Sequence, residues 1–449
     1  MKIHKNILNW LEKIIFIHIG IKFNIIEEEF HYTLKHNNMC ILIKNIDPFF
    51  YLLGKSELGC VHYEVYEKII TPPISQIMPM PTSLSTPTKL FEYKDGKLII
   101  YYDILGLTYW CLSRSEEINR DNELDIHNRF PATSSHAYKH NYLDRPIVDE
   151  WLNIFKQLII YCWPNSNVTD NKFKINLTHD VDFPFRFKFQ NASRIIKSTI
   201  GDIIRFKKYS SLIYSFLIKY TSITFFLKKD PYNTFDWIMD VSEENNIKSE
   251  FYFICGKTDE IRDGDYDIYH KQIKILLRNI YKRGHIVGLH PSYNSYLDPI
   301  QIKNEFARLR QACLEENIDQ KYFGGRMHYL RWKNPNTLMS WEETGLNYDS
   351  SLGYADLPGF RCSTCIEYPA INPINTTILK IYIRPLIVME CTILEKHYMG
   401  VDNYEEALKI FIHYKNQCKK VQGSFTLLWH NSSFMLKKHK KLYKEVIKN

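Results

Sequence analysis

Apolar residues near the N-terminus recur with the spacing of an amphipathic helix. The residues on the apolar face are Ile3, Ile7, Leu11, Ile14 and Ile15. Polar residues interrupt the apolar run and no small-residue cleavage site follows, so the segment is not typical of a secretory signal. We expect this helix to pack on the first domain. No stretch of the chain reaches the roughly 18 to 20 uninterrupted apolar residues of a membrane span, which predicts a soluble, cytoplasmic protein.

Residues 1–147 combine short apolar strands, at 41–43 and 98–102, with helical and turn segments. Several prolines break up the middle of this region and mark exposed loops. No catalytic constellation is evident, so we predict a smaller α+β domain of unknown role. Residues 148–163 are amphipathic at helical spacing and are followed by Pro-Asn-Ser-Asn, which predicts a linking helix and loop over 148–170.

From residue 171 to residue 449, apolar segments of strand length alternate with amphipathic segments of helical length. The predicted strands cover residues 173–177, 249–255, 284–289, 322–329, 345–352 and 424–428, and the predicted helices cover residues 270–283, 300–316, 338–343 and 404–418. This alternation indicates a parallel sheet or barrel. In (β/α) barrels the chemistry lies at the C-terminal ends of the strands, so polar residues near those ends are candidates for a site.

Residues 184–230 interrupt the alternation with a strongly basic segment. It contains ten Lys and Arg against two Asp, and this balance of +8 equals the formal net charge of the whole chain. Interleaved apolar residues indicate an inserted helical subdomain after the first barrel strand. A solvated cover over the barrel and a peripheral contact with an anionic membrane both fit this composition. No recognition motif accompanies the charge, so we predict no nucleic-acid partner.

Hydrophobic residues make up 45% and charged residues 24% of the chain, as in globular proteins that bury a sizeable core. The ten cysteines are scattered, and several lie in apolar runs, which predicts reduced thiols rather than a disulfide framework. Cys362 and Cys365 form the only CxxC pair. No second pair at short spacing accompanies them, so we do not predict a zinc site there.

Polar residues gather at five predicted strand ends. They are Thr178 to Asp182 at the first, then His290, then the group Arg326, His328, Arg331 and Trp332, then Asp349, and finally Trp429 with His430. Carboxylates two residues apart, together with imidazole, can bind Zn²⁺ or another first-row ion. Taken singly, an Asp can cap a turn and a His can be a hydrogen-bonded core residue. Their occurrence at five strand ends of one predicted barrel favours a shared site.

The order of these motifs resembles the polysaccharide deacetylase family, carbohydrate esterase family 4. THDVD (178–182), HPSYN (290–294), RMHYL (326–330) and LLWH (427–430) resemble its four motifs in turn. The stretches DILGLTYWCLSRSEE and DIHNRFPATSSHA resemble the extra N-terminal domain of a branch found in surface-polysaccharide gene sets. The resemblance implies the α/β class, with a distorted (β/α)7-type barrel over residues 171–449 behind a smaller α+β domain.

The resemblance also implies roles for individual residues. Asp180 would be the catalytic base, with Arg326 beside it, and His430 would be the general acid. Asp182 and His290 would bind a divalent metal, with zinc expected and cobalt or nickel as alternatives.

Two departures from the family pattern widen the set of candidate ligands. Asn294 stands where the second motif has its second His, and Val181 separates two Asp that are adjacent in the family. His179 and Asn294 are therefore reserve ligands. The residues expected to line the substrate groove are His328, Arg331, Trp332, Asp349 and Trp429.

The expected function is removal of an acetyl group from an N-acetylated or O-acetylated sugar of a surface polysaccharide or its lipid-linked precursor. The protein would act in the cytoplasm or at the inner face of the membrane. Two alternatives stay open at this point. One is a carbohydrate-binding protein of the same fold that has lost catalysis, and the other is a hydrolase of a different C–N bond.

Overall fold

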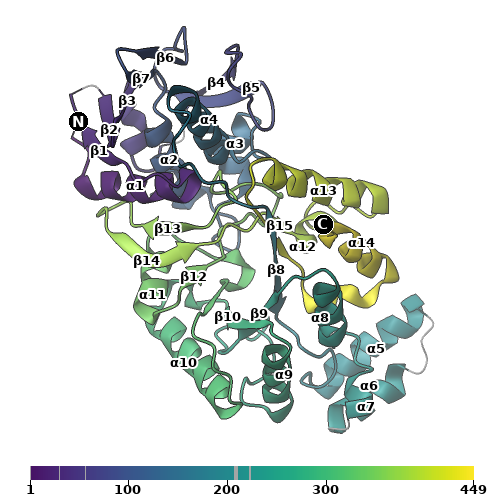
Figure 1. Ribbon diagram of the computed structural model, residues 1–449. Helices are drawn as coiled ribbons and strands as arrows, with labels where there is room; N and C mark the ends of the chain where they lie inside the picture. Colours follow the sequence, from purple (N-terminus) through teal and green to yellow (C-terminus); the bar gives the residue numbers. More distant parts are fainter. Residues whose placement is uncertain (1, 30, 56, 207–210, 222–223, 449) are drawn as a thin grey trace.

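The computed structural model describes residues 2–29, 31–55, 57–206, 211–221 and 224–448 (Figure 1). In the N-terminal region the elements are α1 (Lys5–Ile19), β1 (Asn24–Glu27), β2 (His31–His36), β3 (Met39–Lys44), η1 (Pro48–Tyr51), β4 (Gly59–Glu64), β5 (Ile77–Thr82), β6 (Phe91–Lys94), β7 (Lys97–Ile100), α2 (Ile104–Leu112), η2 (Ser115–Glu117), η3 (Asp121–Glu123), η4 (Ala132–Ser134), α3 (His136–Lys139) and α4 (Ile147–Cys162). Five strands form a sheet in the order β1-β2-β3-β7-β6, and β4 pairs with β5 in a separate hairpin.

Two helices predicted from apolar spacing occur in this region. In α1 the residues Ile7, Leu11, Ile14 and Ile15 are buried as expected. The helix ends at Gly20, whose φ of 82° is a left-handed conformation that glycine adopts without a Cβ clash. Helix α4 covers the predicted linking helix within one residue at each end.

The rest of the chain builds a curled nine-stranded sheet of the barrel type. Its strands are β8 (Lys174–Val181), β9 (Ser249–Ile254), β10 (Ile286–His290), β11 (Gly324–Gly325), β12 (Tyr348–Asp349), β13 (Tyr368–Ile371), β14 (Ile378–Ile383), β15 (Val388–Met389) and β16 (Ser424–Leu428). Their order is β13-β14-β12-β11-β10-β9-β8-β16-β15, and every neighbouring pair is parallel except β13 with β14. No described residues pair β15 with β13, so the sheet is a half-barrel with two open edges.

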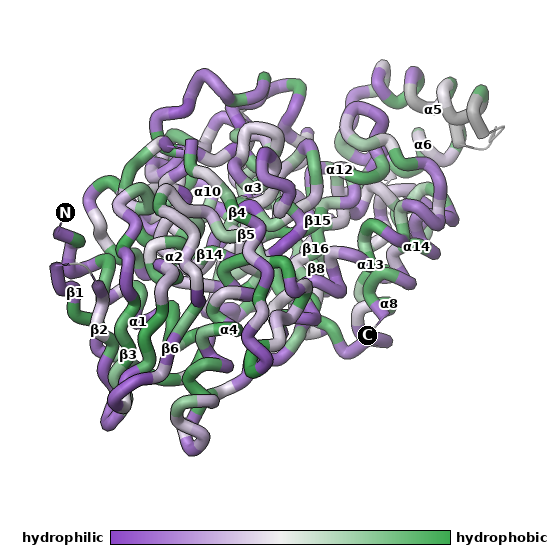
Figure 2. The backbone as a smooth tube through the Cα atoms, turned by 90° about the horizontal axis from the view of Figure 1, so that it is seen from above, coloured by the Kyte–Doolittle hydropathy of each residue, from purple (hydrophilic) through white to green (hydrophobic). Residues whose placement is uncertain are grey.

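Helices surround this sheet. They are α8 (Phe235–Glu244), α9 (Lys271–Lys282), α10 (Pro299–Glu315), α11 (Asn336–Thr344), α12 (Glu390–Leu394), α13 (Tyr404–Lys420) and α14 (Lys437–Ile447), with short turns η5 (Ser295–Leu297), η6 (His328–Leu330) and η7 (Asn431–Met435). Between β8 and α8 lie α5 (Ala192–Phe206), α6 (Ser211–Tyr220) and α7 (Thr224–Leu227). Figures 1 and 2 show α5 and α6 projecting at one side of the molecule. Part of the basic segment, at 207–210 and 222–223, lies outside the described residues.

The first barrel strand is longer than predicted. The expectation was a strand over 173–177 with the polar cluster after it, whereas β8 continues to Val181. Because side chains alternate across a strand, Thr178 and Asp180 face one side of the sheet and His179 faces the other. This alternation separates residues that the sequence groups together.

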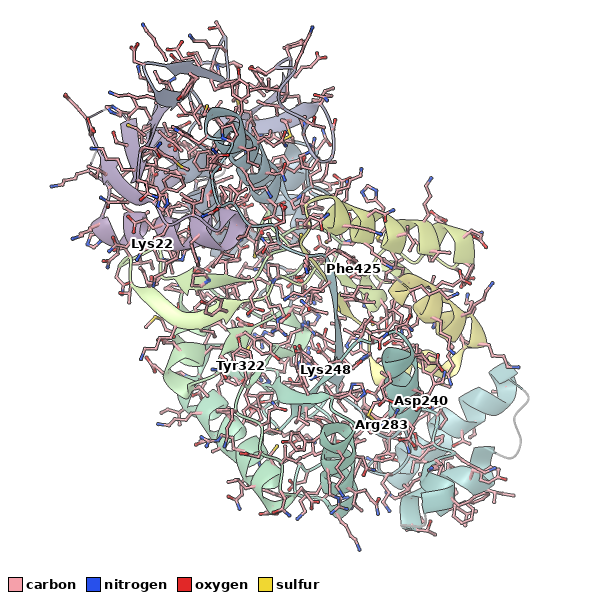
Figure 3. All side chains as sticks on the ribbon, viewed as in Figure 1. Lys22, Asp240, Lys248, Arg283, Tyr322 and Phe425 are labelled. Atoms are coloured by element: carbon pink, nitrogen blue, oxygen red, sulfur yellow. The ribbon has the colours of Figure 1, made fainter. Side chains whose placement is uncertain are left out.

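The two regions share one core of buried apolar side chains, and Trp10, Trp151 and Phe425 all belong to it. Phe425 of β16 lies near the meeting of the two regions, whereas Asp240 of α8 and Arg283 after α9 lie far from it, toward α5 to α7 (Figure 3). The indole nitrogen Nε1 of Trp10 in α1 donates to the carbonyl of Pro369 in β13 over 2.7 Å. The division at residue 147 therefore stays a prediction.

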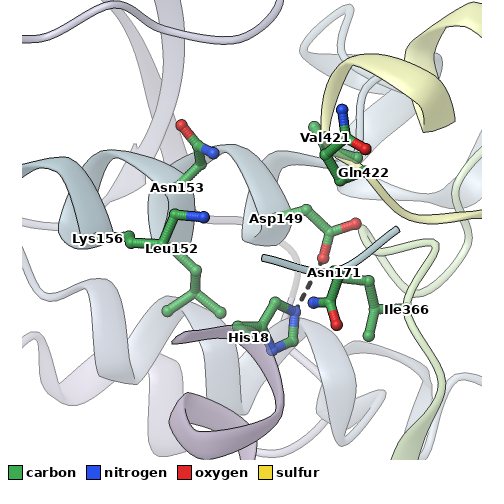
Figure 4. A pocket seen from close by; sticks show the side chains of 9 residues that line it. All are labelled: His18, Asp149, Leu152, Asn153, Lys156, Asn171, Ile366, Val421 and Gln422. Atoms are coloured by element: carbon green, nitrogen blue, oxygen red, sulfur yellow. Dashed lines mark hydrogen bonds and ion pairs between the residues drawn. The ribbon is translucent and has the colours of Figure 1, made fainter. Parts of the chain in front are cut away.

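A buried carboxylate on α4 joins both regions (Figure 4). Asp149 Oδ1 lies 3.1 Å from His18 Nε2 of α1, and Asp149 Oδ2 accepts a hydrogen bond from the backbone N–H of Cys365 over 2.8 Å. The side chain of Thr364 also donates to it.

All ten cysteines are free thiols, as predicted. Among the described helices, none is both long and apolar enough to cross a membrane.

Truncation of Trp10 tests this shared core. Trp10→Ala should lower the free energy of unfolding by roughly 3–5 kcal/mol, because a fully buried ring and a hydrogen bond are lost. Phe16→Ala is the matched control, since Phe16 lies on the same helix but is 52% exposed. The measurement is the urea midpoint of both variants. Equal shifts would contradict a core role for Trp10.

Candidate metal centre and active site

The C-terminal ends of the parallel strands bring six ionisable side chains to one place. Asp180 and Asp182 come from the end of β8, His290 ends β10, and His328 follows β11. Glu390 directly follows β15, and His430 comes two residues after β16. Because the strands are parallel, these ends meet at one edge of the sheet.

Asp182, His290 and His328 form a compact group. Asp182 Oδ1 lies 3.2 Å from His290 Nε2 and 3.6 Å from His328 Nε2. One ligand atom from each of the three residues lies within 4.8 Å of the others, a spacing that can hold a metal ion. Both imidazoles are buried, and Asp182 is partly buried.

Two neighbours orient the imidazole rings. His290 Nδ1 lies 2.5 Å from the carbonyl of Arg326, and His328 Nδ1 lies 2.9 Å from Asp263 Oδ1. These contacts leave Nε2 of each ring facing Asp182. Hydrogen bonds of this kind fix the orientation of metal-binding histidines. Asp263 was not predicted, because it lies in a loop far from any motif.

Two further observations fit a cation at this group. Asp182 Oδ1 is buried, yet it accepts no hydrogen bond from any described residue. Burial disfavours charge on His328, but the carboxylates of Asp182 and Asp263 outweigh that effect and raise its pKa to about 9. The group therefore favours positive charge. One carboxylate and two imidazoles are a donor set that suits zinc and other first-row divalent ions.

Asp180 and Arg326 form a buried ion pair beside this group. Arg326 Nη1 donates to Asp180 Oδ1 over 2.7 Å, and neither side chain is appreciably exposed. Arg326 also donates to Thr178 Oγ1 over 2.9 Å and to the carbonyl of Ser350 over 3.0 Å. Asp180 Oδ2 lies 3.7 Å from His290 Nε2.

The glycine pair of β11 allows Arg326 to reach this position. A Cβ at Gly325 would lie 1.7 Å from the Leu289 carbonyl oxygen, and one at Gly324 would lie 2.3 Å from the Tyr348 ring. Only glycine fits such close approaches. The backbone can therefore pass next to β10 and present Arg326 and His328 at the site.

His430 lies on another side of the pocket and is paired with Glu390. Its Nδ1 is 2.8 Å from Glu390 Oε1, and its Nε2 is 3.7 Å from Asp182 Oδ2. Burial opposes charge on His430, but Glu390 outweighs it and raises the pKa of His430 well above its usual value. Sequence analysis missed Glu390, although it directly follows a short apolar run, as the other site residues do.

The structure does not bring the two reserve ligands to the metal group. His179 faces the opposite side of β8, where its Nδ1 lies 2.6 Å from the Trp429 carbonyl and its ring stacks on Phe251. Asn294 Nδ2 donates to the Thr258 carbonyl over 2.9 Å, and its Oδ1 accepts from Arg331 over 2.9 Å. His328, expected to line the groove, does line the pocket, and its Nε2 also lies within reach of a cation held by Asp182 and His290.

Four residues expected to contact substrate are used inside the protein. Arg331 donates to the carbonyls of His127 and Tyr293. Trp332 Nε1 donates to Asp349 Oδ2 over 3.1 Å, and both are buried. Trp429 is fully buried and stacks on Phe411 and Phe434. None of the four lines the pocket that contains Asp182.

The cavity volume of that pocket is about 180 Å³. Its lining includes the metal group, Asp180, His430, Cys391, Tyr329, Leu330, Met389, Glu395, His397, Tyr398, Leu428 and, from the N-terminal region, Arg129. A carboxylate that can act as a base, a charged imidazole and a cation-binding group thus face one space. Such an arrangement can hydrolyse an acyl group.

Comparison with protein families gives one match, in the N-terminal region. Residues 3–164 match the profile of a family of unknown function, DUF7033. No curated protein matches the chain significantly.

One solved structure is described as a polysaccharide deacetylase from Mycobacterium smegmatis. It is 14% identical in sequence, the match covers 64% of this chain and 84% of the other chain, and the TM-score is 0.40. The Puue allantoinase is 11% identical (64% and 85% covered, TM-score 0.37). A structure described as a polysaccharide deacetylase from Pseudomonas aeruginosa PAO1 is 13% identical (64% and 85% covered, TM-score 0.36).

Metal content tests the ligand set. Wild-type protein should carry one equivalent of a divalent metal by elemental analysis, and Asp182→Ala, His290→Ala and His328→Ala should each lose it. Asn294→Ala and His179→Leu are the controls and should retain it, because neither side chain faces the group. Retention of metal by His328→Ala together with its loss from Asn294→Ala would reverse the assignment.

Proposed function

We propose that this protein is a metal-dependent deacetylase that hydrolyses an N-acetyl or O-acetyl group on a sugar of a surface polysaccharide or its precursor. The observation that carries the proposal is that the Asp182–His290–His328 group, Asp180 and His430 all line one pocket, with Glu390 paired to His430 behind it. Each of the three parts has a role in acyl hydrolysis.

Asp182, His290 and His328 would hold the metal. A divalent cation there supplies Lewis acidity toward the acetyl carbonyl and an attacking water. Asp180 accepts the proton from that water through its carboxylate. Arg326 fixes the Asp180 side chain, because the hydrogen bond to Oδ1 leaves Oδ2 on the side of His290.

His430 donates the second proton. As the C–N or C–O bond of the acetyl group breaks, the leaving nitrogen or oxygen takes a proton from Nε2. Glu390 holds the other nitrogen, Nδ1, and favours the charged ring. Acetate and the free amine or hydroxyl are the products.

A binding protein without catalysis was the main alternative from the sequence, because Asn294 replaces a ligand of the resembled family. The position of His328 supports the enzyme instead, since it supplies the second imidazole. The pairing of His430 with a buried Glu390 also favours catalysis, because a glycan-binding site needs no charged imidazole.

We also propose that the helical insertion contacts an anionic membrane and that the substrate is lipid-linked. Ile196, Ile200 and Ile204 are spaced by four residues on α5, and all three are exposed. Near α7, Lys228 and Lys229 line a separate pocket of about 1460 Å³ with Tyr214 and Trp237 among its apolar walls. Exposed apolar rows with adjacent cations are typical of membrane-surface elements.

Loss of either proton-transfer group tests the proposed function. Asp180→Asn and His430→Ala should each lower the rate of acetate release from N-acetylated oligosaccharides by roughly 10²- to 10⁴-fold, with metal content retained. Asp240→Asn is the control, since Asp240 is a surface carboxylate paired with Arg283. Unchanged turnover in Asp180→Asn would refute the assignment.

The pH profile tests the role of Glu390. Because its charge raises the pKa of His430, Glu390→Gln should lower that pKa. His430 acts in its protonated form, so activity should then be lost at a lower pH as the pH rises. The measurement is kcat/KM against pH for the variant and the wild type. If activity falls at the same alkaline pH in both proteins, the proposed role of His430 as the general acid paired with Glu390 is contradicted.

Vesicle co-sedimentation tests the membrane contact. Wild-type protein should pellet with anionic vesicles at low salt and less at high salt, because exposed charges are screened. The double variant Ile200→Asp/Ile204→Asp should remain in the supernatant. Ile300→Asp on α10 is the control, since Ile300 is equally exposed elsewhere. The proposal would be contradicted if the protein bound neutral and anionic vesicles equally and salt had no effect on binding.

A further inference from the structure

A segment of the N-terminal region lies across the mouth of the half-barrel. Residues 121–135, called the crossing segment below, contact the loops that follow β10 and β11. His127 Nδ1 lies 2.8 Å from the hydroxyl of Tyr293, and its carbonyl accepts from Arg331 over 2.9 Å. Further along, the backbone N–H of Ala132 donates to the carboxylate of Asp356 over 3.0 Å. The crossing segment is therefore held at two points against loops of the C-terminal region.

Arg129 is the residue of this segment that lines the pocket with the metal group. Asp125 orients it by accepting from Arg129 Nε over 2.8 Å. Nη1 donates to the carbonyl of Tyr329 over 3.2 Å and to the hydroxyl of Tyr398 over 3.3 Å. Among the described residues, Nη2 has no hydrogen-bond partner, although only 8% of the side chain is exposed.

The backbone that Arg129 contacts directly follows the third ligand. Tyr329 and Leu330 both have left-handed φ angles, 61° and 58°, which are uncommon for residues with a side chain. Such conformations persist where the surroundings hold them, and they are frequent at functional sites. The hydrogen bond from Arg129 to the Tyr329 carbonyl is one such constraint.

We propose that Arg129 binds an anionic group of the substrate, a carboxylate or a phosphate, next to the acetyl group that is removed. This inference rests on the proposed function and names its substrate class, and it gives the DUF7033 region a part in the active site. Nη2 offers two N–H donors in the planar arrangement that suits carboxylate and phosphate oxygens.

The charges around Arg129 are compatible with this role. Asp125 neutralises part of its charge, and it also accepts the backbone N–H groups of His127 and Arg129. Asp182 and Glu395 line the pocket as well, and metal at Asp182 would offset its charge. A neutral sugar would make only neutral hydrogen bonds to Nη2, whereas a carboxylate or phosphate would make charge-assisted ones, so the anionic group should bind more tightly.

Binding of three probes tests the inference. They are N-acetylglucosamine, N-acetylglucosamine 6-phosphate, and a disaccharide of N-acetylglucosamine with glucuronic acid. Calorimetric titrations use full-length protein as purified, and direct metal–anion contact, which wild type and Arg129→Gln share, cancels when the two are compared. We expect at least one anionic probe to bind wild type roughly tenfold or more tightly than the neutral sugar. Tighter binding of the 6-phosphate indicates a phosphate on the substrate, and tighter binding of the glucuronic acid disaccharide indicates a carboxylate.

Arg129→Gln should abolish this preference for the anion, and Arg129→Lys should keep part of it. Arg120→Gln is the matched control. Arg120 is also a buried arginine next to the crossing segment, where it pairs with Glu123 and donates to the Ser134 carbonyl, but it does not line the pocket. Any of three results would overturn the inference. Wild type could show no preference for the anion, Arg129→Gln could keep the preference, or Arg120→Gln could lose it to the same extent as Arg129→Gln.

The outcome is separable from that of the proposed function, because binding does not require turnover. Anion preference without acetate release from any sugar would refute the deacetylase proposal and leave the anion site standing. Acetate release without anion preference would refute only the anion site. Metal content of Arg129→Gln, measured on protein as purified, should equal that of wild type, and its loss would instead make Arg129 a positioning residue for His328.

Discussion

The buried guanidinium of Arg326 is the constraint on which the site depends. Its charge lies fully inside the half-barrel, where an unpaired ion would be very costly. Four hydrogen bonds satisfy it, to Asp180, to Thr178, and to the side chain and carbonyl of Ser350. Because its own carbonyl accepts from His290, one residue fixes the proposed base and orients a proposed ligand at the same time.

Two charge systems meet around this centre, with His430 Nε2 3.7 Å from Asp182 Oδ2. Asp182 and its two imidazoles form a group that could hold a cation, whereas Glu390 favours a charged His430 on another side. A substrate between them would meet an electrophilic side and a proton donor. The N-terminal region contributes Arg129 to the lining of the same pocket, and Asp149 on α4 contacts both α1 and the loop before β13.

Much of this arrangement could be predicted from the chain. His290, Asp182 and His430 follow apolar runs of strand length, and parallel strands bring such ends together. His328 was expected in the groove and Asn294 near the metal, because Asn294 holds the expected position in the motif and nothing local distinguishes His328 from a groove residue. Asp263 lies in a segment without a motif, and nothing in the sequence around Arg129 or Glu390 assigned them to the site, so their contacts in space identify all three.

The sequence by itself determined the alternation of elements, because burial of one face requires apolar residues at the period of a helix or a strand. It also determined the residues that this alternation places at strand ends, among them the buried pair of Asp180 and Arg326. Tertiary structure decided which of those residues meet. Strand β8 extends through the polar cluster, so alternation turns His179 away from the pocket. The glycine strand β11 lets the backbone approach β10 closely enough to deliver His328. The orientation of His179 depends on the length of β8, and the position of His328 depends on the close approach of β11 to β10. No local pattern of side chains specifies the length of a strand or its distance from a neighbour.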